Sequence, residues 1–141
     1  MTSDVPHELR SAIAQRAGGR CEYCLIHEQD AGFPHQIDHI VSRKHGGLST
    51  LENLALACVL CNRYKGTDIA SIDSQTGELA RLLNPRQDRW IDHFRLDSAT
   101  IEPLSAIGRV TANLLRLNAP PHGGECIDET DSTDRKTTAS V

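Results

Sequence analysis

Aromatic side chains are scarce in this 141-residue chain, where Phe, Trp and Tyr together make up 4% of the sequence. Apolar residues of all kinds reach 38%, which is below the roughly 45–50% of an ordinary globular chain. Burial of apolar surface alone therefore predicts a weak core, and a bound metal ion becomes an attractive cross-link. The length fits one modest domain, or a compact core with an appendage, and excludes several full domains.

Long apolar runs are also absent. No segment approaches the roughly 20 apolar residues that a helix needs to cross a bilayer. The opening segment, MTSDVPHELR, lacks the charged and apolar regions of a signal peptide. We therefore expect no membrane partner and a cytoplasmic location.

An excess of basic residues, the usual mark of a nucleic-acid partner, is missing as well. The net charge is -4. Most of the excess acid lies in residues 121–141, which hold five Asp or Glu and two Lys or Arg. The rest of the chain is nearly neutral, so it can bind phosphate through a local basic patch or a metal ion. Strong affinity for DNA that resists salt is not expected.

Cysteines are few, but four of the five stand in two close pairs, Cys21 with Cys24 and Cys58 with Cys61. Two intervening residues let both thiolates of a pair face one ion, and two pairs complete the tetrahedral shell that Zn²⁺ prefers. In a reducing compartment such pairs favour metal ligation over disulfides. Because the thiolates fill the shell, we expect a structural and not a catalytic zinc. The alternatives are buried cysteines without a metal and a redox-active pair; Cys126 is left over.

Composition and turn signals divide the chain into four parts. The first three alternate apolar periodicity with turns that contain Gly or Pro, whereas the last has almost nothing to bury. We expect, in order, an N-terminal helix (1–19), a core (20–67), an extension that packs on the core (68–118) and a disordered acidic tail (119–141).

Capping and breaking residues predict the elements within these parts. In the first two parts they are a helix capped by Ser3 or Asp4 and ended by Gly18-Gly19, an extended run at 36–41, an extended or turn-like segment at 51–56, and a short helix at 59–65. In the extension they are a hairpin turning at Thr76-Gly77, a helix capped at Asn84-Pro85 that carries Trp90, Ile91 and Phe94, a hairpin around Asp97-Ser98, and a last helix capped by Ser105 that carries Ile107, Val110, Leu114 and Leu117.

The segment between the cysteine pairs holds side chains suited to phosphodiester hydrolysis, which needs a cation, a base for water and a scaffold for both. Asp38 offers a hard oxygen ligand for Mg²⁺ or Mn²⁺, and Asn62 offers an amide oxygen. The unperturbed pKa of histidine, about 6.5, suits His39 to act as a general base. A solvated surface pair is the alternative for Asp38 and His39. His35, close by in sequence, can sit beside the metal.

The order of these residues resembles a known family. The pattern C-x2-C, DHI, GG, ENL, C-x2-CN, K-G, at about residues 20 to 66, resembles the HNH, or ββα-metal, endonucleases. Residues 67 to 118, with TGE, NPRQDRW, HFRL and GR, are similar to an extension found on a group of small bacterial HNH proteins.

The resemblance implies an α+β fold, with a small ββα-metal core and a zinc knuckle between the N-terminal helix and the hairpin and helix extension. It implies that His39 takes a proton from water, giving a 5′-phosphate and a 3′-hydroxyl. Asn53 would tie down the loop and keep the histidine ring oriented; a plain turn cap is the alternative. The third letter of the family name is Asn62 here instead of His, which favours Mg²⁺ or Mn²⁺ over zinc or nickel.

Basic residues near this set can grip phosphates on either side of the cut. They are Arg43, Lys44, Arg63 and Lys65, with His45 as a further contact. Solvated charges without a role are the alternative for each of them.

Three functions fit the sequence. The first is a DNA endonuclease with one catalytic cation and a structural zinc. The second is a zinc-stabilised module that binds nucleic acid without cutting it, which the near-neutral charge of the core favours. The third is a purely structural zinc domain. A homodimer would let two sites cut opposing strands, but no heptad pattern or apolar patch announces one.

Overall fold

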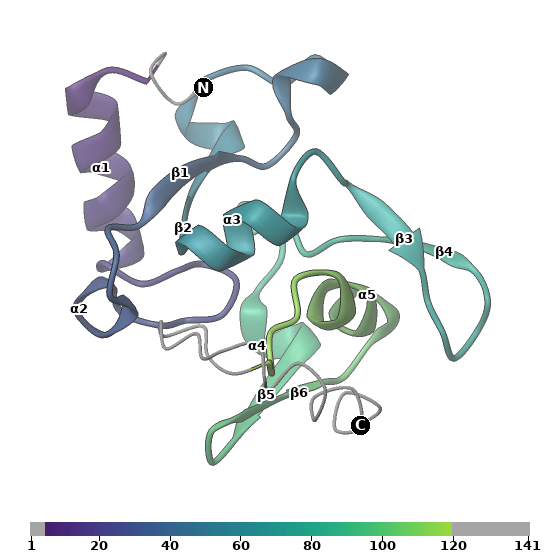
Figure 1. Ribbon diagram of the computed structural model, residues 1–141. Helices are drawn as coiled ribbons and strands as arrows, with labels where there is room; N and C mark the ends of the chain where they lie inside the picture. Colours follow the sequence, from purple (N-terminus) through teal and green to yellow (C-terminus); the bar gives the residue numbers. More distant parts are fainter. Residues whose placement is uncertain (1–4, 120–141) are drawn as a thin grey trace.

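The computed structural model describes residues 5–119, and its elements fall into two groups (Figure 1). The first group is α1 (His7–Ala17), α2 (Glu28–Ala31), β1 (Gln36–His39), the 3-10 turns η2 (Arg43–His45) and η3 (Leu51–Asn53), β2 (Leu54–Ala57) and α3 (Val59–Lys65). The second is β3 (Ala70–Ile72), β4 (Leu79–Arg81), α4 (Trp90–His93), β5 (Phe94–Asp97), β6 (Thr100–Pro103) and α5 (Ala106–Leu114).

The first group is built around an antiparallel hairpin of β1 and β2. Ile37 pairs with Leu56 and His39 with Leu54. Because side chains alternate along a strand, Ile37, Leu54 and Leu56 share one face, and they form an apolar core with Val5 and Ile13. Helix α1 packs on β2, and α3 packs against both strands (Figure 1). The order strand, strand, helix is therefore the one that the sequence predicted.

The second group has its own antiparallel hairpins, β3 with β4 and β5 with β6. Helix α5 lies against β4 and β6. The buried side chains of this second group form a single cluster with those around the cysteine knuckle. The cluster contains Cys21, Tyr23, Ala57, Cys58, Cys61, Leu82, Leu83, Phe94, Ile101, Val110, Leu115 and Leu117. The extension thus shares a core with the segment that carries the cysteines.

Most predicted elements are confirmed, but three details are wrong. Helix α1 begins after Pro6, which precedes it in an extended conformation, and not after Ser3 or Asp4; those two residues lie outside the described range. Its end is confirmed, since Gly18 adopts φ 64° and closes the helix. The loop after Cys24 contains the short helix α2, which the sequence analysis treated as turns.

The helix expected after Asn84 is much shorter than predicted. Helix α4 spans only Trp90–His93, and Phe94 already belongs to β5. The side chain of Asn84 does cap a turn, because its Oδ1 accepts the backbone N–H of Arg86 at 2.9 Å. Asp88 then accepts the backbone N–H of Asn84 at 2.8 Å, which closes the segment into a loop before α4.

The last helix and both hairpins agree with the prediction. Ser105 caps α5 by accepting the backbone N–H of Gly108 at 3.0 Å. Leu117 lies beyond the end of this helix but is buried. The predicted acidic tail, apart from residue 119, lies outside the described residues. Within residues 5–119, no helix has both the length and the apolar character that crossing a membrane requires.

A buried ion pair joins the β3–β4 hairpin to α5, and it yields a first prediction. Asp73 is 1% exposed and accepts two hydrogen bonds from Arg109, at 2.8 and 2.9 Å. This guanidinium is the main reason why the pKa of Asp73 lies well below its ordinary value. Asp73→Asn should therefore lower the melting temperature by several degrees at pH 7, measured by circular dichroism.

The stabilisation by Asp73 is full above the ordinary carboxyl pKa of about 4. It is lost as the pH falls towards the lowered pKa, so the wild type and Asp73→Asn should differ less in strong acid. Asp68→Asn, which changes an exposed carboxylate, is the matched control and should leave the melting temperature unchanged. Equal melting of Asp73→Asn and wild type at pH 7 would contradict the assignment.

Candidate functional site

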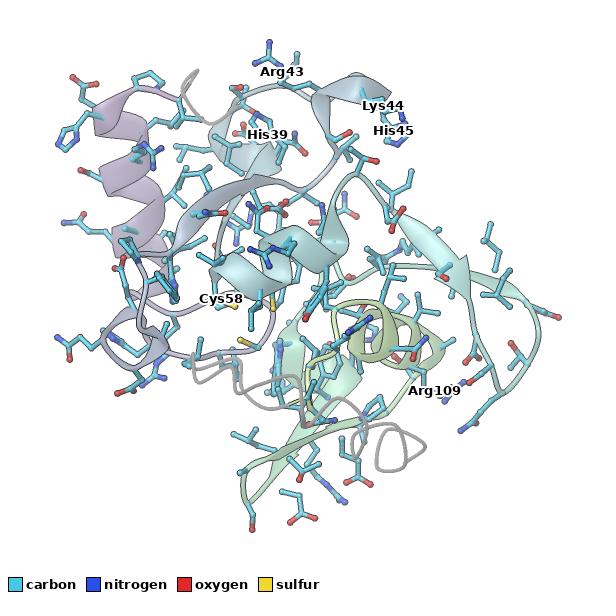
Figure 2. The ribbon with its side chains drawn as sticks, viewed as in Figure 1. His39, Arg43, Lys44, His45, Cys58 and Arg109 are labelled. Carbon is cyan, nitrogen blue, oxygen red and sulfur yellow. The ribbon has the colours of Figure 1, made fainter. Side chains whose placement is uncertain are left out.

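The two cysteine pairs meet in space. The sulfur atoms of Cys21, Cys24, Cys58 and Cys61 all lie within 4.8 Å of one another. The Cys24 and Cys58 sulfurs are 3.8 Å apart, which is about the edge of a tetrahedron with Zn–S bonds of about 2.3 Å. Figure 2 shows the sulfur atoms together beside α3, next to the label of Cys58.

Backbone amides surround these sulfurs. The N–H groups of Tyr23 and Cys24 point at the Cys21 sulfur, and that of Cys61 points at the Cys58 sulfur, each at 3.4 Å. Amides in these positions stabilise thiolate charge, so the cluster is suited to a metal ion and not to four neutral thiols. Four sulfur ligands would close the shell of such an ion, which would then have a structural role.

The knuckle fixes both ends of the segment that carries Asp38 and His39. Cys58 is at once a ligand and the N-cap of α3. Cys21 and Cys24 precede the segment, and Cys61 lies inside the helix that follows it. A single ion can therefore clamp α3 against the hairpin. Cys126, the remaining cysteine, lies outside the described residues.

A cleft of about 870 Å³ runs beside β1. Within residues 5–119, strand β1 pairs with no strand other than β2. Side chains from both of its faces reach the cleft. Asp38, His39 and Asn62 all line it. The structure thus brings together the carboxylate, the imidazole and the amide that the sequence singled out.

Asp38 lies at the bottom of the cleft and is 3% exposed. Its Oδ2 accepts the Tyr23 hydroxyl at 2.7 Å, and its Oδ1 accepts the Lys65 ammonium at 3.3 Å. Burial raises the pKa of Asp38 above its ordinary value, while Lys65 and Tyr23 oppose that rise. Burial and the nearby carboxylate also raise the pKa of Tyr23, so its hydroxyl stays protonated and donates.

His39 is half-buried at the end of β1. Its Nε2 lies 2.9 Å from the Ser49 hydroxyl. Burial lowers the pKa of His39 from its ordinary value, although the Asp38 charge acts in the opposite direction. The ring is therefore mostly neutral at pH 7, as a base must be.

Asn62 is fixed by a neighbour on β1. Its amide nitrogen donates to the Gln36 side-chain oxygen at 2.6 Å, and this bond does not use the Asn62 oxygen. That oxygen and the remaining lone pairs of Asp38 are hard donors of the kind that Mg²⁺ and Mn²⁺ prefer. Asp38 and Asn62 thus offer oxygen atoms of the kind that such a cation would bind.

The Asn53 side chain ties the loop after β1 to the start of β2. Its Oδ1 accepts the Val41 N–H, and its Nδ2 donates to the Val41 and Leu48 carbonyls, all at 2.9 Å. Gly47 packs against the same group, because an added Cβ would lie 1.7 Å from the Val41 oxygen. Asn53 is thus placed to hold the loop that carries Ser49, the partner of His39.

This network gives a second prediction. Asn53→Ala removes all three side-chain hydrogen bonds at once, so the loop should move away from His39. If the site cleaves DNA, cleavage should fall by about 10- to 100-fold, as removal of an orienting group does. Plasmid nicking measures the loss. Unchanged nicking would contradict the orienting role; Asn84→Ala, which removes a cap in the extension, is the control.

The basic residues predicted to contact phosphate are not all at the cleft. Arg43 and Lys44 line it from η2. His45 is exposed on the same turn, and Arg63 is exposed on α3, but neither lines the cleft. Figure 2 shows Arg43, Lys44 and His45 on the same side of the molecule as His39, away from Cys58.

The phosphate contact predicted for Lys65 is wrong. Its side chain is 1% exposed, and its ammonium donates to Asp38 and to the carbonyls of His39 and Ile40. These hydrogen bonds use all its donors inside the protein. Lys65 is a buried counter-ion that fastens α3 to the end of β1.

The sequence analysis also missed residues at the cleft. Arg10 of α1 lines it, and only the packing of α1 brings it there. His35, which the sequence singled out as a possible neighbour of the metal, is buried and lines the cleft too; its Nε2 lies 3.0 Å from the Ile26 carbonyl, and its Nδ1 has no hydrogen-bond partner among the described residues. Tyr23 was not predicted either, because its burial comes from the packing of the fold; once it is buried, its hydroxyl needs a polar partner.

Comparison with known proteins agrees with this geometry. A family model described as HNH endonuclease matches residues 21–68. No curated protein and no solved structure gave a significant match to the chain. The matched range begins at the first cysteine, contains the β1–β2 hairpin and α3, and ends at residue 68, where the extension begins. Residues 21–68 therefore match an HNH endonuclease domain, with a small α+β ββα-metal fold and four cysteines placed to bind a metal ion.

Proposed function

We propose that the protein is a metal-dependent endonuclease that hydrolyses phosphodiester bonds of DNA. One observation carries the proposal: Asp38, His39 and Asn62 line a single cleft within the HNH domain. The closed cysteine knuckle takes no part in the reaction and would hold a structural zinc. The nuclease class rests on the family match. That the substrate is DNA is our proposal.

In this proposal His39 accepts a proton from water, and the resulting hydroxide attacks phosphorus. The P–O3′ bond breaks and the leaving 3′ oxygen takes a proton from solvent water, which leaves a 5′-phosphate and a 3′-hydroxyl. Asp38 and Asn62 would hold Mg²⁺ or Mn²⁺, and this cation would neutralise the charge that develops on the phosphate. Ser49 orients the imidazole, and Arg43 and Lys44 hold neighbouring phosphates at the rim of the cleft.

Lys65 affects how the cation would bind. Its ammonium already neutralises Asp38 at 3.3 Å, so the protein ligands together carry little net negative charge. The oxygens of the DNA phosphate then complete the cation's surroundings, as they do at many Mg²⁺ sites. We therefore infer that the cation binds more tightly with DNA than without it.

Nicking of supercoiled plasmid by the purified full chain tests the proposal. Mg²⁺ or Mn²⁺ should give nicked and then linear DNA, and EDTA added with the DNA should abolish both. Single-stranded, nicked and branched substrates tested alongside identify the target. Failure to cut any of them in Mg²⁺, Mn²⁺, Ni²⁺ or Zn²⁺ would refute the endonuclease.

A second function has an observation in its favour. The ion pair between Asp38 and Lys65 leaves the carboxylate satisfied without any cation, as a nucleic-acid-binding module without cleavage would require. Such a module predicts retention of DNA in a gel-shift assay with no cleavage in any metal. The two functions therefore give opposite results with the same protein and the same DNA.

A further inference from the structure

Tyr23 lies between two of the knuckle cysteines and touches the proposed cation site. Its hydroxyl donates to Asp38 Oδ2 at 2.7 Å, and its backbone N–H points at the Cys21 sulfur at 3.4 Å. The whole residue is 0% exposed. One side chain thus connects the metal knuckle with the carboxylate at the bottom of the cleft.

We propose that Tyr23 is a positioning residue, which holds Asp38 in the orientation that binds the cation and through which the knuckle and the extension act on the cleft. The proposal rests on the proposed function, because it concerns the cation of the same site. It assigns a role in that site to a residue outside the family's Asp, His and Asn set.

The chemistry of the carboxylate explains why one hydroxyl matters. A carboxylate offers about four lone-pair positions; the Tyr23 hydroxyl takes one on Oδ2 and the Lys65 ammonium one on Oδ1. Lys65 lies on a flexible stem and also bonds the carbonyls of His39 and Ile40. The phenol is held by a rigid, buried ring, so it fixes the rotation of the carboxylate and directs the remaining lone pairs.

The extension also contacts the turn between Cys21 and Cys24 that carries Tyr23. The indole N–H of Trp90 donates to the Tyr23 carbonyl at 2.9 Å. Arg86 forms an ion pair with Glu22, whose other oxygen accepts the Leu56 N–H at 2.9 Å. The turn that carries Tyr23 is thus fixed by the knuckle, by β2 and by the extension, which gives the extension a part in the site without any catalytic residue of its own.

Tyr23→Phe in the full zinc-loaded chain tests this proposal, because it removes the hydroxyl and keeps the buried ring. Groups that orient a metal ligand typically contribute 10- to 100-fold to metal affinity. We expect Mn²⁺ affinity, measured by electron paramagnetic resonance with and without duplex DNA, to fall by about that factor. The Mn²⁺ concentration for half-maximal nicking should rise equally, while the rate at saturating Mn²⁺ and the zinc content stay those of the wild type.

Tyr64→Phe is the matched control, since this tyrosine lies on α3 and its ring stacks under Arg116, and it should leave Mn²⁺ affinity unchanged. Should Tyr23→Phe fail to retain zinc, Trp90→Phe provides the second variant. It removes the hydrogen bond to the Tyr23 carbonyl and keeps an aromatic ring, although a smaller one, against Phe94; a smaller loss of Mn²⁺ affinity in the same direction is expected.

The outcomes separate this proposal from the proposed function. Wild-type Mn²⁺ affinity in both Tyr23→Phe and Trp90→Phe overturns the positioning role, even if the wild type cuts DNA. A loss of Mn²⁺ affinity in Tyr23→Phe upholds it, even if no substrate is cut. A lower melting temperature with unchanged Mn²⁺ affinity marks Tyr23 as merely structural and also overturns the proposal.

Discussion

Replacing His39 by alanine is expected to lower DNA nicking by about 10²- to 10⁴-fold, the usual contribution of a general base. The imidazole is the group that lines the cleft beside Asp38 and is mostly neutral at pH 7, because burial lowers its pKa. Half-buried at the end of β1, it contributes little to either core. Initial rates of plasmid nicking at saturating Mn²⁺ measure the loss, while the melting temperature and the zinc content should stay those of the wild type.

The control for His39→Ala is His7→Ala, which removes an exposed imidazole from the first turn of α1 and should leave nicking unchanged. Ser49→Ala removes the hydroxyl 2.9 Å from the His39 ring. It should have a smaller effect than His39→Ala, because the ring remains and loses only its orientation. Full activity of His39→Ala would refute the assignment of the base, and equal losses in both histidine variants would point to an effect on folding.

Local chemistry explains what the sequence predicted correctly. Cys-x2-Cys spacing and the short extended run that contains β1 depend on neighbours a few positions apart, so both can be predicted from the chain. The same holds for α3, which begins after Cys58 and ends at Gly66, where the sequence predicted it. Local spacing does not predict that Asp38 and Asn62 share a cleft. The resemblance to the HNH endonucleases predicted it.

Long-range packing explains what the sequence did not predict. Lys65 looked like a phosphate contact because a lysine near a catalytic motif is usually exposed. Only the fold shows that its neighbours are Asp38 and the carbonyls of His39 and Ile40, which lie 25 to 27 positions earlier in the chain. The segment after Asn84 forms a loop instead of the expected helix, because the Asp88 carboxylate accepts hydrogen bonds from the Asn84 backbone and from Arg81.

The shared core of the two halves has a physical reason. With 4% aromatic residues, neither half has enough large side chains to build a full core alone. The buried cluster therefore runs from Leu82, Phe94 and Val110 of the extension to the cysteines of the knuckle. Loss of the metal should consequently destabilise both halves, and it should disturb the cleft through Tyr23.

Removing the knuckle metal should unfold the protein. Structural zinc contributes about 10–16 kcal/mol in small zinc domains, which equals or exceeds the roughly 5–15 kcal/mol that stabilises a typical domain. Cys58→Ser should do the same, because Cys58 is both a ligand and the cap of α3. Circular dichroism and zinc analysis before and after a strong chelator measure the effect, and added Zn²⁺ should restore the fold of the wild type only.

Cys126→Ser is the matched control, since Cys126 belongs to neither cysteine pair, and it should keep the wild-type zinc content and melting temperature. A chelated chain that melts as the wild type does would contradict the clamp, because apolar packing alone would then hold α3 against the hairpin. The expected result has a direct consequence for function. Because the metal fixes the helix of Asn62 and the turn of Tyr23 at the same time, the cleft should lose its geometry in the same transition in which the fold is lost.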